Sequence, residues 1–374
     1  MRIAVACPMK PLAQGNPSGD RATAVGLVSG LRALGHDVRE VSGFRTRWFY
    51  RRPRQVLRAL GAVAAGLLRT AAMEPHVFLA FHSYYKAPDL IGPLARRLLG
   101  IPYVLFQPMF ATKYRRRPET LPGYLLNRAA LRACDLAVTN NRDDIEALAR
   151  VLPGERIVYL PPAVDTRLFS RDEAAGRAVR AAHGIPPGVP LLFSAAMMRR
   201  DVKSESLRHL FRALGRLEGA GEPFWVLLAG DGPERPALEA LARETLPGRV
   251  VFAGKVPRET MPACYSAADL FVFPGIGESL GMVYLEAQSC GCPVAALATS
   301  GVPQVVEDGA GGLLAPYDPE GAGLAGVVLR FLRDPALRRR MGEAGARRVR
   351  SRNDLPLVSS ALSGLLSNLA GGVP

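Results

Sequence analysis

The stretch FVFPGIGESLGMVYLEAQSCGCPV, residues 271–294, decides how the chain is interpreted. An apolar run over 269–273 predicts a buried strand, the Pro-Gly-Ile-Gly sequence after it predicts a turn, and an apolar helix then ends near Gly291. Pro293 begins the next strand, 294–297. We therefore expect Glu278 to lie between a strand and a helix, at the carboxyl edge of a parallel sheet, where open α/β sheets bind ligands.

The helix after Glu278 is expected to begin with an anion site. Its donors would be the unpaired backbone N–H groups of Ser279, Leu280, Gly281 and Met282. Glu286 follows eight residues after Glu278, at most about 12 Å along a helix, roughly the reach from a sugar ring past a pyrophosphate to a ribose. Because Glu286 lies among apolar residues, its carboxylate needs a partner. Ribose hydroxyls would serve, and a local salt bridge is the alternative, with Glu278 then only favouring the helix dipole.

This pattern resembles the E-x7-E signature of family-4 retaining glycosyltransferases with the GT-B fold. The flanking segments agree in order and spacing: AGDGP over 229–233, VFAG over 251–254 and YSAAD over 265–269. The resemblance covers nearly the whole chain, most closely over residues 225–320. It implies an α/β protein of GT-B architecture, with two Rossmann-like parallel-sheet domains facing each other across a cleft.

Length and composition allow this architecture. The 374 residues suffice for two domains with large cores. Residues 59–73 form the longest nearly apolar run, which we expect to be a core helix rather than a membrane span, and the N-terminus predicts a strand rather than a signal peptide. Five scattered cysteines suit a reducing cytoplasm. Two of them, Cys290 and Cys292, are expected to be buried thiols rather than metal ligands.

Positive charge is concentrated in the first half of the chain. Residues 1–170 carry 25 Lys and Arg against 12 Asp and Glu, a net charge of +13, whereas residues 171–374 carry +2. Residues 44–58 hold six arginines around Trp48, Phe49 and Tyr50, and residues 113–117 form a second basic cluster. Such segments fit a membrane interface or an anionic-ligand loop. An exposed helix start with extended arginines is the alternative, and a nucleic-acid platform fits less well.

The first half opens with a strand, a long loop, a helix and a strand over residues 2–42. It lacks G-x-G-x-x-G, so a dinucleotide site is not indicated. The resemblance implies that Gly19 faces the donor phosphates, with a simple turn glycine as the alternative. His82 follows the strand 77–81 and is predicted to contact acceptor or donor sugar, unless it is structural. Related enzymes commonly have a histidine after the next strand, where this chain has Gln107.

The second half begins with a strand over 190–197, followed by RRDVK. The resemblance implies an arginine and a lysine here that bind the pyrophosphate. Lys203 matches, whereas Arg199 or Arg200 must replace the usual arginine. Cations at a helix start are unfavourable for the dipole, so a bound anion accounts for them better than a solvated face. Backbone groups near Lys255 and Val256 are expected to hold the nucleobase.

The expected domain limits are 1–170 for an acceptor-binding domain, 171–188 for a linker and 189–345 for a donor-binding domain. C-terminal helices over 346–374 complete the chain, and in enzymes of this architecture the last helix returns to the first domain. The end of the first domain is expected from the PPAVD sequence over 161–165, which resembles a P-N-G-V-D segment at this place in the family.

The predicted function is retaining transfer of a sugar from a nucleotide-sugar to an acceptor. Glu278 would orient the sugar hydroxyls, Glu286 the ribose, and Lys203 with one arginine the diphosphate. No cofactor or metal is expected, because two cations can neutralise the diphosphate and no Asp-x-Asp pair exists.

The basic half indicates an acceptor that is lipid-linked or otherwise anionic, and a cytoplasmic protein peripheral on the inner face of the membrane. Nucleic acid is not an expected partner. Two alternatives remain open: a GT-B-fold sugar-nucleotide epimerase, and a non-catalytic protein that binds anionic lipid or nucleic acid.

Overall fold

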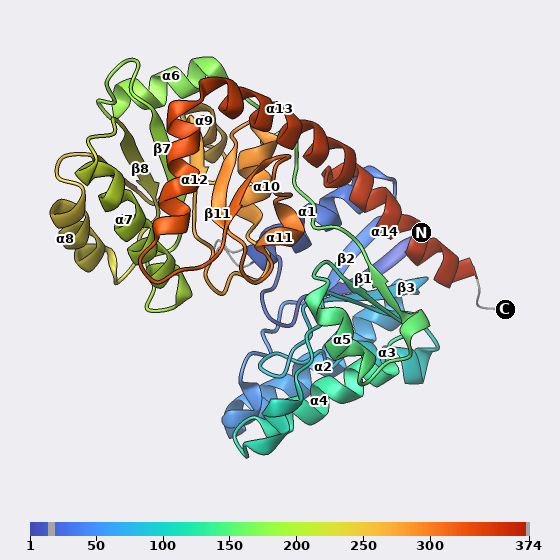
Figure 1. The fold of residues 1–374 in the computed structure, drawn as a ribbon. Coiled ribbons are helices and arrows are strands. Elements are labelled where there is room, and N and C mark those ends of the chain that lie inside the picture. Colours follow the sequence, from blue (N-terminus) through green and yellow to red (C-terminus); the bar gives the residue numbers. More distant parts are fainter. Residues whose placement is uncertain (14–18, 372–374) are drawn as a thin grey trace. The chain divides into compact units, whose positions relative to one another are not determined.

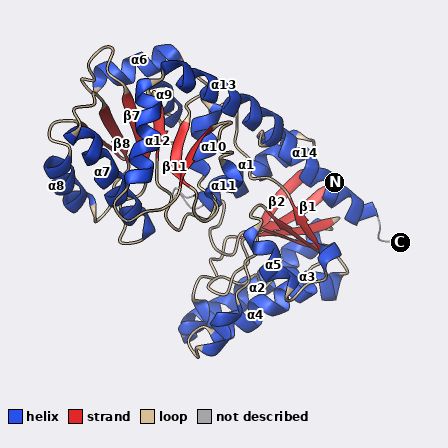
Figure 2. Ribbon diagram, in the orientation of Figure 1, coloured by secondary structure: helices blue, strands red, loops and turns tan. Residues whose placement is uncertain are grey.

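The computed structural model describes residues 1–13 and 19–371, which form two α/β units (Figures 1 and 2). Unit 1 comprises Met1–Ala163 and Leu355–Pro374, and unit 2 comprises Val164–Asp354. Each unit is built on a parallel sheet of six strands with helices packed against it. The predicted fold class, two Rossmann-like parallel-sheet domains, is confirmed.

The sheet of unit 1 has the strand order β2-β1-β3-β4-β5-β6, and every pairing is parallel. The order in which the chain adds strands changes side at β1, because β2 lies on one side of β1 and the later strands lie on the other. The strands are β1 Arg2–Ala6, β2 Asp37–Ser42, β3 Val77–Phe81, β4 Tyr103–Phe106, β5 Leu136–Thr139 and β6 Ile157–Tyr159.

Helices cover both faces of this sheet. Successive residues of β1 point into two different cores. Ile3 and Val5 lie in the core with α1 and α14, and Ala4 lies in the core on the other face, with α2, α3 and α4. The helices are α1 Gly19–Ala33, η1 Phe49–Arg51, α2 Pro53–Met73, α3 Gly92–Leu99, η2 Thr112–Arg116, α4 Leu121–Ala133, α5 Asp143–Ala149, η3 Gly154–Arg156 and α14 Leu355–Gly371.

The sheet of unit 2 has the order β12-β11-β10-β7-β8-β9, again parallel throughout. The chain starts at the central strand β7, proceeds to one edge through β8 and β9, and resumes on the other side of β7 with β10. The strands are β7 Leu191–Ala195, β8 Trp225–Ala229, β9 Val250–Gly254, β10 Leu270–Val272, β11 Val294–Leu297 and β12 Gly312–Ala315.

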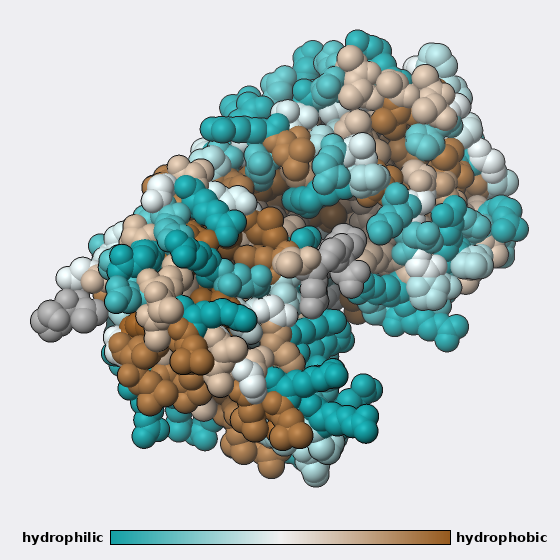
Figure 3. All heavy atoms as spheres, turned by 180° about the vertical axis from the view of Figure 1, so that it is seen from behind, coloured by the Kyte–Doolittle hydropathy of each residue, from teal (hydrophilic) through white to brown (hydrophobic). Residues whose placement is uncertain are grey.

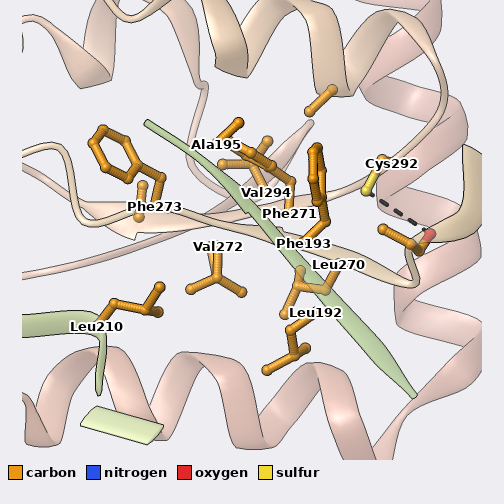
Figure 4. Close-up of a cluster of buried hydrophobic side chains, with 14 of the residues drawn as sticks. Leu192, Phe193, Ala195, Leu210, Leu270, Phe271, Val272, Phe273, Cys292 and Val294 are labelled. Carbon is orange, nitrogen blue, oxygen red and sulfur yellow. Dashed lines mark hydrogen bonds between the residues drawn. The ribbon is translucent and has the colours of Figure 1, made fainter. Parts of the chain in front are cut away.

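The helices of unit 2 are α6 Glu173–Ala182, α7 Val202–Gly219, α8 Arg235–Thr245, α9 Met261–Ala267, α10 Met282–Ser289, α11 Val302–Val305, α12 Ala322–Arg333 and α13 Pro335–Arg352. Helix α7 contacts α8 and α12, and α10 contacts α9 and α13. The two central strands are apolar on both faces, and Phe193 of β7 and Phe271 of β10 lie in one buried cluster (Figure 4). This core holds the two central strands side by side, which fixes the loops that follow them.

The segment 171–188, expected to be a linker, contains α6 and belongs to unit 2. Its Gly176 lies so close to the backbone of Ser266 that an added Cβ would be 2.8 Å from the Ser266 carbonyl oxygen. Arg180 donates to an Asp269 carboxylate oxygen at 2.5 Å and to the Ala267 carbonyl at 2.8 Å. These contacts fasten α6 onto unit 2, whose other limit likewise extends past the expected residue 345 to Asp354.

The expectation of a core helix over 59–73 is wrong. Helix α2 buries Ala59, Gly66 and Thr70, but only 17% of its most apolar 18-residue window is buried. It is also the one helix in the described part of the chain that is long and apolar enough to cross a membrane by length and composition. Its composition resembles that of a core helix because its solvent-facing side is also apolar.

Candidate functional site

The candidate site lies at the carboxyl edge of the unit 2 sheet, between β7 and β10, where the strand order changes side. Strands β7 and β10 are neighbours there, so the loops that follow them are brought together. Open parallel sheets bind ligands at such a point. Lys203 follows the first loop and Glu278 lies in the second, although 75 residues separate them in sequence.

The loop after β7 is shaped by the glycine turn after β8. A Cβ on Gly232 would lie 2.3 Å from the Met198 carbonyl oxygen, so only glycine permits this approach. The Met198 amide donates to the Asp231 carbonyl at 3.0 Å, which ties the two loops together. Asp201 then caps α7, accepting from the Lys203 amide at 2.9 Å. The sequence pattern AGDGP therefore acts by positioning the start of α7.

The loop after β10 is held by a second close approach. A Cβ on Gly301 would lie 1.6 Å from the Ser279 carbonyl oxygen, and the Gly301 amide donates to the Glu278 carbonyl at 3.0 Å. From the other side, the Ile276 amide donates to the Ser206 hydroxyl of α7 at 3.0 Å. The backbone around Glu278 is thus fixed by groups from both neighbouring segments.

Lys203 and Glu278 form an ion pair between Nζ and Oε2. Their side chains are 26% and 18% exposed, so both charges are partly withdrawn from water yet open to a ligand. Lys203 Nζ also lies 5.8 Å from the centre of the Phe273 ring. The structure therefore brings together the two residues that the sequence proposed for the diphosphate and for the sugar.

The two arginines proposed beside Lys203 point elsewhere. Arg200 donates from Nε to Glu234 at 2.7 Å, and Arg208 of α7 shares that carboxylate at 2.8 Å. These two guanidinium groups lower the pKa of Glu234, with the hydrogen bond from Arg200 as the largest cause. Arg199 is exposed and lies within 2.8 Å of the Met197 sulfur. Neither arginine has a recorded contact with Lys203 or Glu278 in residues 1–13 and 19–371.

Glu286 is buried in α10, with its side chain 5% exposed, and both carboxylate oxygens have partners. Arg258 donates to Oε1 at 2.6 Å, and the Tyr265 hydroxyl donates to Oε2 at 3.1 Å. Burial, with the neighbouring Glu286 charge, raises the pKa of Tyr265 well above its ordinary value, so the phenol stays a donor. The local salt bridge that the sequence left open is present. Sequence reasoning missed Arg258, because 28 residues separate it from Glu286.

Helix α10 begins at Met282, later than the sequence predicted. Gly281 is its N-cap with φ of 75°, so Ser279 and Leu280 lie in the preceding loop. The packing of Gly301 against Ser279 keeps this segment out of the helix. Among the residues that the structure describes, no protein acceptor is recorded for the amides of Leu280, Gly281 and Met282. The loop and first turn can still offer donors to an anion.

Lys255 and Val256 follow β9, which is the edge strand beside β8. The Lys255 side chain is exposed, and Val256 is half-buried against the core of unit 2. Both lie at the same carboxyl edge as Lys203, and Arg258 two residues later links this segment to Glu286. The Lys255 segment is therefore connected to Glu286 through Arg258.

His82 and Gly19 belong to unit 1. The buried His82 ring donates from Nε2 to the Asp20 carbonyl at 3.0 Å, and its backbone has φ of 60°. Burial lowers the pKa of His82, although the Asp20 charge opposes this, so the ring is neutral at pH 7. Asp20 pairs with Lys10 at 2.9 Å. Burial works against the ionised Asp20 carboxyl, but the charges of His82 and Lys10 lower its pKa overall.

Gly19 is exposed and is the first residue of α1. Residues 14–18 of the long loop before Gly19 lie outside the described residues. The contacts of His82 within unit 1 agree with the structural role that the sequence left open.

The cysteines are all free and buried. Burial raises the pKa of Cys290 to about 12, so this thiol stays protonated and is a poor metal ligand. Across the described ranges, no group of three or more His, Cys, Asp or Glu side chains is arranged to hold a metal ion.

Comparison with known proteins gives the family. The model of the family described as Glycosyl transferases group 1 matches residues 178–348. The 2-deoxystreptamine glucosyltransferase of Streptomyces kanamyceticus is 31% identical over 66% of this chain, but the match spans only 65% of that protein's length. The D-inositol 3-phosphate glycosyltransferase of Xylanimonas cellulosilytica is 30% identical over 77% of this chain and 72% of that protein.

A solved structure agrees in fold. The Anabaena protein HepE in complex with UDP-glucose has a TM-score of 0.71 at 18% identity, over 98% of this chain and 99% of that chain. These findings confirm the predicted likeness to glycosyltransferases, and they argue against the epimerase and the nucleic-acid-binding protein kept as alternatives. The chain belongs to the group 1 family of glycosyl transferases.

Proposed function

We propose that this chain is a retaining, metal-independent glycosyltransferase that moves a sugar from a nucleotide-sugar to an acceptor. The observation that carries the proposal is the Lys203–Glu278 ion pair at the carboxyl edge between β7 and β10. As the bond between sugar and diphosphate breaks, negative charge develops on the diphosphate and positive charge on the sugar. A cation and a carboxylate at one point complement these two charges.

Lys203 is assigned to the diphosphate. In the free protein its charge is balanced by Glu278, so neither group is left unpaired in a partly buried site. A bound diphosphate would draw the ammonium away, leaving Glu278 free to accept hydrogen bonds from the hydroxyls of the donor sugar. The amides of Leu280, Gly281 and Met282 would add donors to the leaving phosphate, which makes a metal unnecessary.

Glu286 is assigned to the ribose. Each carboxylate oxygen can accept about two hydrogen bonds, so the contacts with Arg258 and Tyr265 leave acceptor capacity for two ribose hydroxyls. Arg258 and Tyr265 would then act by orienting the carboxylate. The segment at Lys255 and Val256 is assigned to the nucleobase, beyond the ribose.

Retention and family-4 membership are proposed from the resemblance of the E-x7-E stretch. In such a reaction the leaving phosphate itself would take the acceptor proton, because no histidine accompanies the Lys203–Glu278 pair among its recorded contacts in the described residues.

The acceptor is assigned to unit 1 and is proposed to be lipid-linked or otherwise anionic, since residues 1–170 carry a net charge of +13. A cytoplasmic location is proposed with it. Five buried free thiols are compatible with a reducing compartment.

Thermal unfolding in the presence of UDP, GDP, ADP and their sugar conjugates tests the donor site. One nucleotide should raise the unfolding temperature of the wild type, by an amount equivalent to about 2.7 kcal/mol at 100 times its Kd. Lys203→Ala and Glu286→Ala should abolish that shift. Exposed Arg339 on α13 offers a matched control, since Arg339→Ala also removes one charge from unit 2 and should leave the shift intact. Equal shifts in all variants would refute the site.

A further inference from the structure

The outward face of α2 is apolar over most of its length. Leu57, Leu60 and Leu68 are 70%, 63% and 73% exposed. Their spacing, with Gly61 and Ala64 between them, places them along one side of the helix. No charged residue occurs from Ala59 to Leu68. Figure 3 shows hydrophobic residues gathered on the surface of unit 1. A soluble helix normally presents polar residues here, so this face indicates a partner.

The opposite face of α2 is fastened to the sheet of unit 1. A Cβ on Gly66 would lie 2.6 Å from Ile91 Cδ1 and 3.7 Å from the Cβ of Ser42 in β2. Arg69 donates from Nη1 to the Val41 carbonyl of β2 at 3.0 Å. The helix is long enough to span a bilayer, but spanning would break this packing. Its geometry suits a position in the plane of a surface.

Arginines surround the N-terminal end of the same helix. A pocket of about 530 Å³ is lined by Phe44, Arg45, Arg47, Trp48, Arg51, Arg52 and Gln55. The Arg51 guanidinium lies 3.6 Å from the centre of the Trp48 ring. Residues 44–73 contain no acidic residue. The pocket thus offers several guanidinium groups to a phosphate without a competing carboxylate from its own segment.

The second basic cluster adjoins this pocket. Trp48 packs edge-on against Tyr85 at 5.6 Å between ring centres, and Tyr85 stacks on Tyr114 at 3.6 Å. Tyr114 lies within η2, between Lys113 and Arg115. Arg51 also donates to the Glu119 carbonyl at 3.5 Å. The two basic segments, 44–58 and 113–117, therefore form one cationic and aromatic surface, the composition found at bilayer interfaces.

We propose that unit 1 docks on an anionic phospholipid bilayer, with α2 lying in the interfacial plane and the arginine pocket holding a lipid phosphate. Charge and apolarity together select this occupant. A second copy would bring a second cationic surface against the first, and a nucleic acid would leave the leucines in water. Only an anionic bilayer satisfies the leucines and the arginines together. This inference goes beyond the proposed sugar transfer and does not depend on the donor site.

Vesicle flotation of the full chain tests the proposal. The wild type should float with vesicles of phosphatidylcholine containing phosphatidylglycerol, and less with phosphatidylcholine alone or at high salt. The triple variant Leu57→Gln, Leu60→Gln, Leu68→Gln should bind more weakly, by about tenfold for each leucine that enters the interface. Leu357→Gln is the matched control, because Leu357 is 49% exposed on α14, on the other face of the sheet. It should float like the wild type.

A second variant separates charge from apolarity. Arg51→Gln, Arg52→Gln, Arg54→Gln should lose the preference for anionic vesicles while circular dichroism stays unchanged. Should the leucine triple variant fail to fold, a Leu60→Trp variant replaces it, and its added emission should shift to the blue on anionic vesicles. Three results would overturn the proposal: no flotation of the wild type at low salt, equal flotation of a folded leucine triple variant, or a wild-type dimer in solution that this variant converts to monomer.

Discussion

Both sheets are parallel with six strands, but their strand orders differ, and their carboxyl edges hold charged side chains differently. In unit 2 the loops after β7 and β10 bring Lys203 and Glu278 together, and both stay partly exposed. In unit 1 the loops after β1 and β3 bring Lys10, Asp20 and His82 together, with the histidine buried and neutral. In both units the charged groups meet where the loops after two neighbouring strands come together. The pair in unit 2 is partly exposed and can exchange its protein partner for a ligand, whereas the buried His82 of unit 1 cannot.

The largest effect expected is on turnover, in unit 2. Glu278→Gln and Lys203→Ala should each lower kcat by about 10²–10³-fold, the usual cost of one electrostatic contact to a transition state. Because the two side chains contact each other, the double variant should lose less than the product of the two losses. Nucleotide release with the identified donor measures this. Multiplicative losses would show that the groups act independently.

Next comes the backbone packing that positions Glu278. Gly301→Ala should destabilise unit 2 by about 3 kcal/mol, because the new methyl meets the Ser279 carbonyl and cannot be accommodated without moving the loop. Thermal unfolding, with and without nucleotide, measures it. Gly326→Ala is the control: its Cβ meets open space within α12, so it should stabilise by about 0.5–1 kcal/mol. Equal stability of the two variants would contradict the packing argument.

The salt bridge to Glu286 should have a smaller effect. Arg258→Ala should destabilise unit 2 by about 2 kcal/mol, because it leaves a buried carboxylate with Tyr265 as its remaining recorded partner. Adding Glu286→Gln should restore much of the stability, while nucleotide affinity stays low. If the double variant binds nucleotide like the wild type, Glu286 has no role with the ribose.

The smallest effect concerns pH and unit 1. The folded pKa of His82 is lowered, so the unfolded chain binds more protons, and stability should fall as pH drops below about 6.5, approaching 1.4 kcal/mol per pH unit. His82→Asn should remove this dependence, since asparagine tolerates the positive φ. Native-state hydrogen exchange in β1 and β3, compared at neutral and mildly acidic pH, measures it. An unchanged pH profile in the variant would exclude His82 as its source.

The sequence predicted much of the fold because the strands are buried on both faces. Strands β3 and β11 have the predicted limits, as expected for apolar runs bounded by turn residues. Helix α2 was assigned wrongly to the core, since composition does not tell which of two apolar faces is covered. The segment 171–188 was taken as a linker because the contacts of Gly176 and Arg180 that fix α6 involve residues nearly 90 positions away.

The site was predictable in part for a similar reason. Lys203 and Glu278 each follow a recognisable strand, so their meeting follows from parallel topology. The directions of Arg199 and Arg200 do not follow from topology, because they depend on where Glu234 lies. The partner of Glu286 was also beyond sequence reasoning, since nothing near Arg258 in the chain marks it as an ion-pair partner.

Helix α14 returns the last part of the chain to unit 1, where Val358, Leu362 and Leu366 pack with residues of β1 and α1. During synthesis the ribosome makes all of unit 2 before these residues. The face of the unit 1 sheet that α1 and α14 share therefore lacks α14 while the 191 residues of unit 2 emerge. Unit 2 is encoded continuously and can fold first, so it is expected to form cotranslationally, before the residues of α14 complete unit 1.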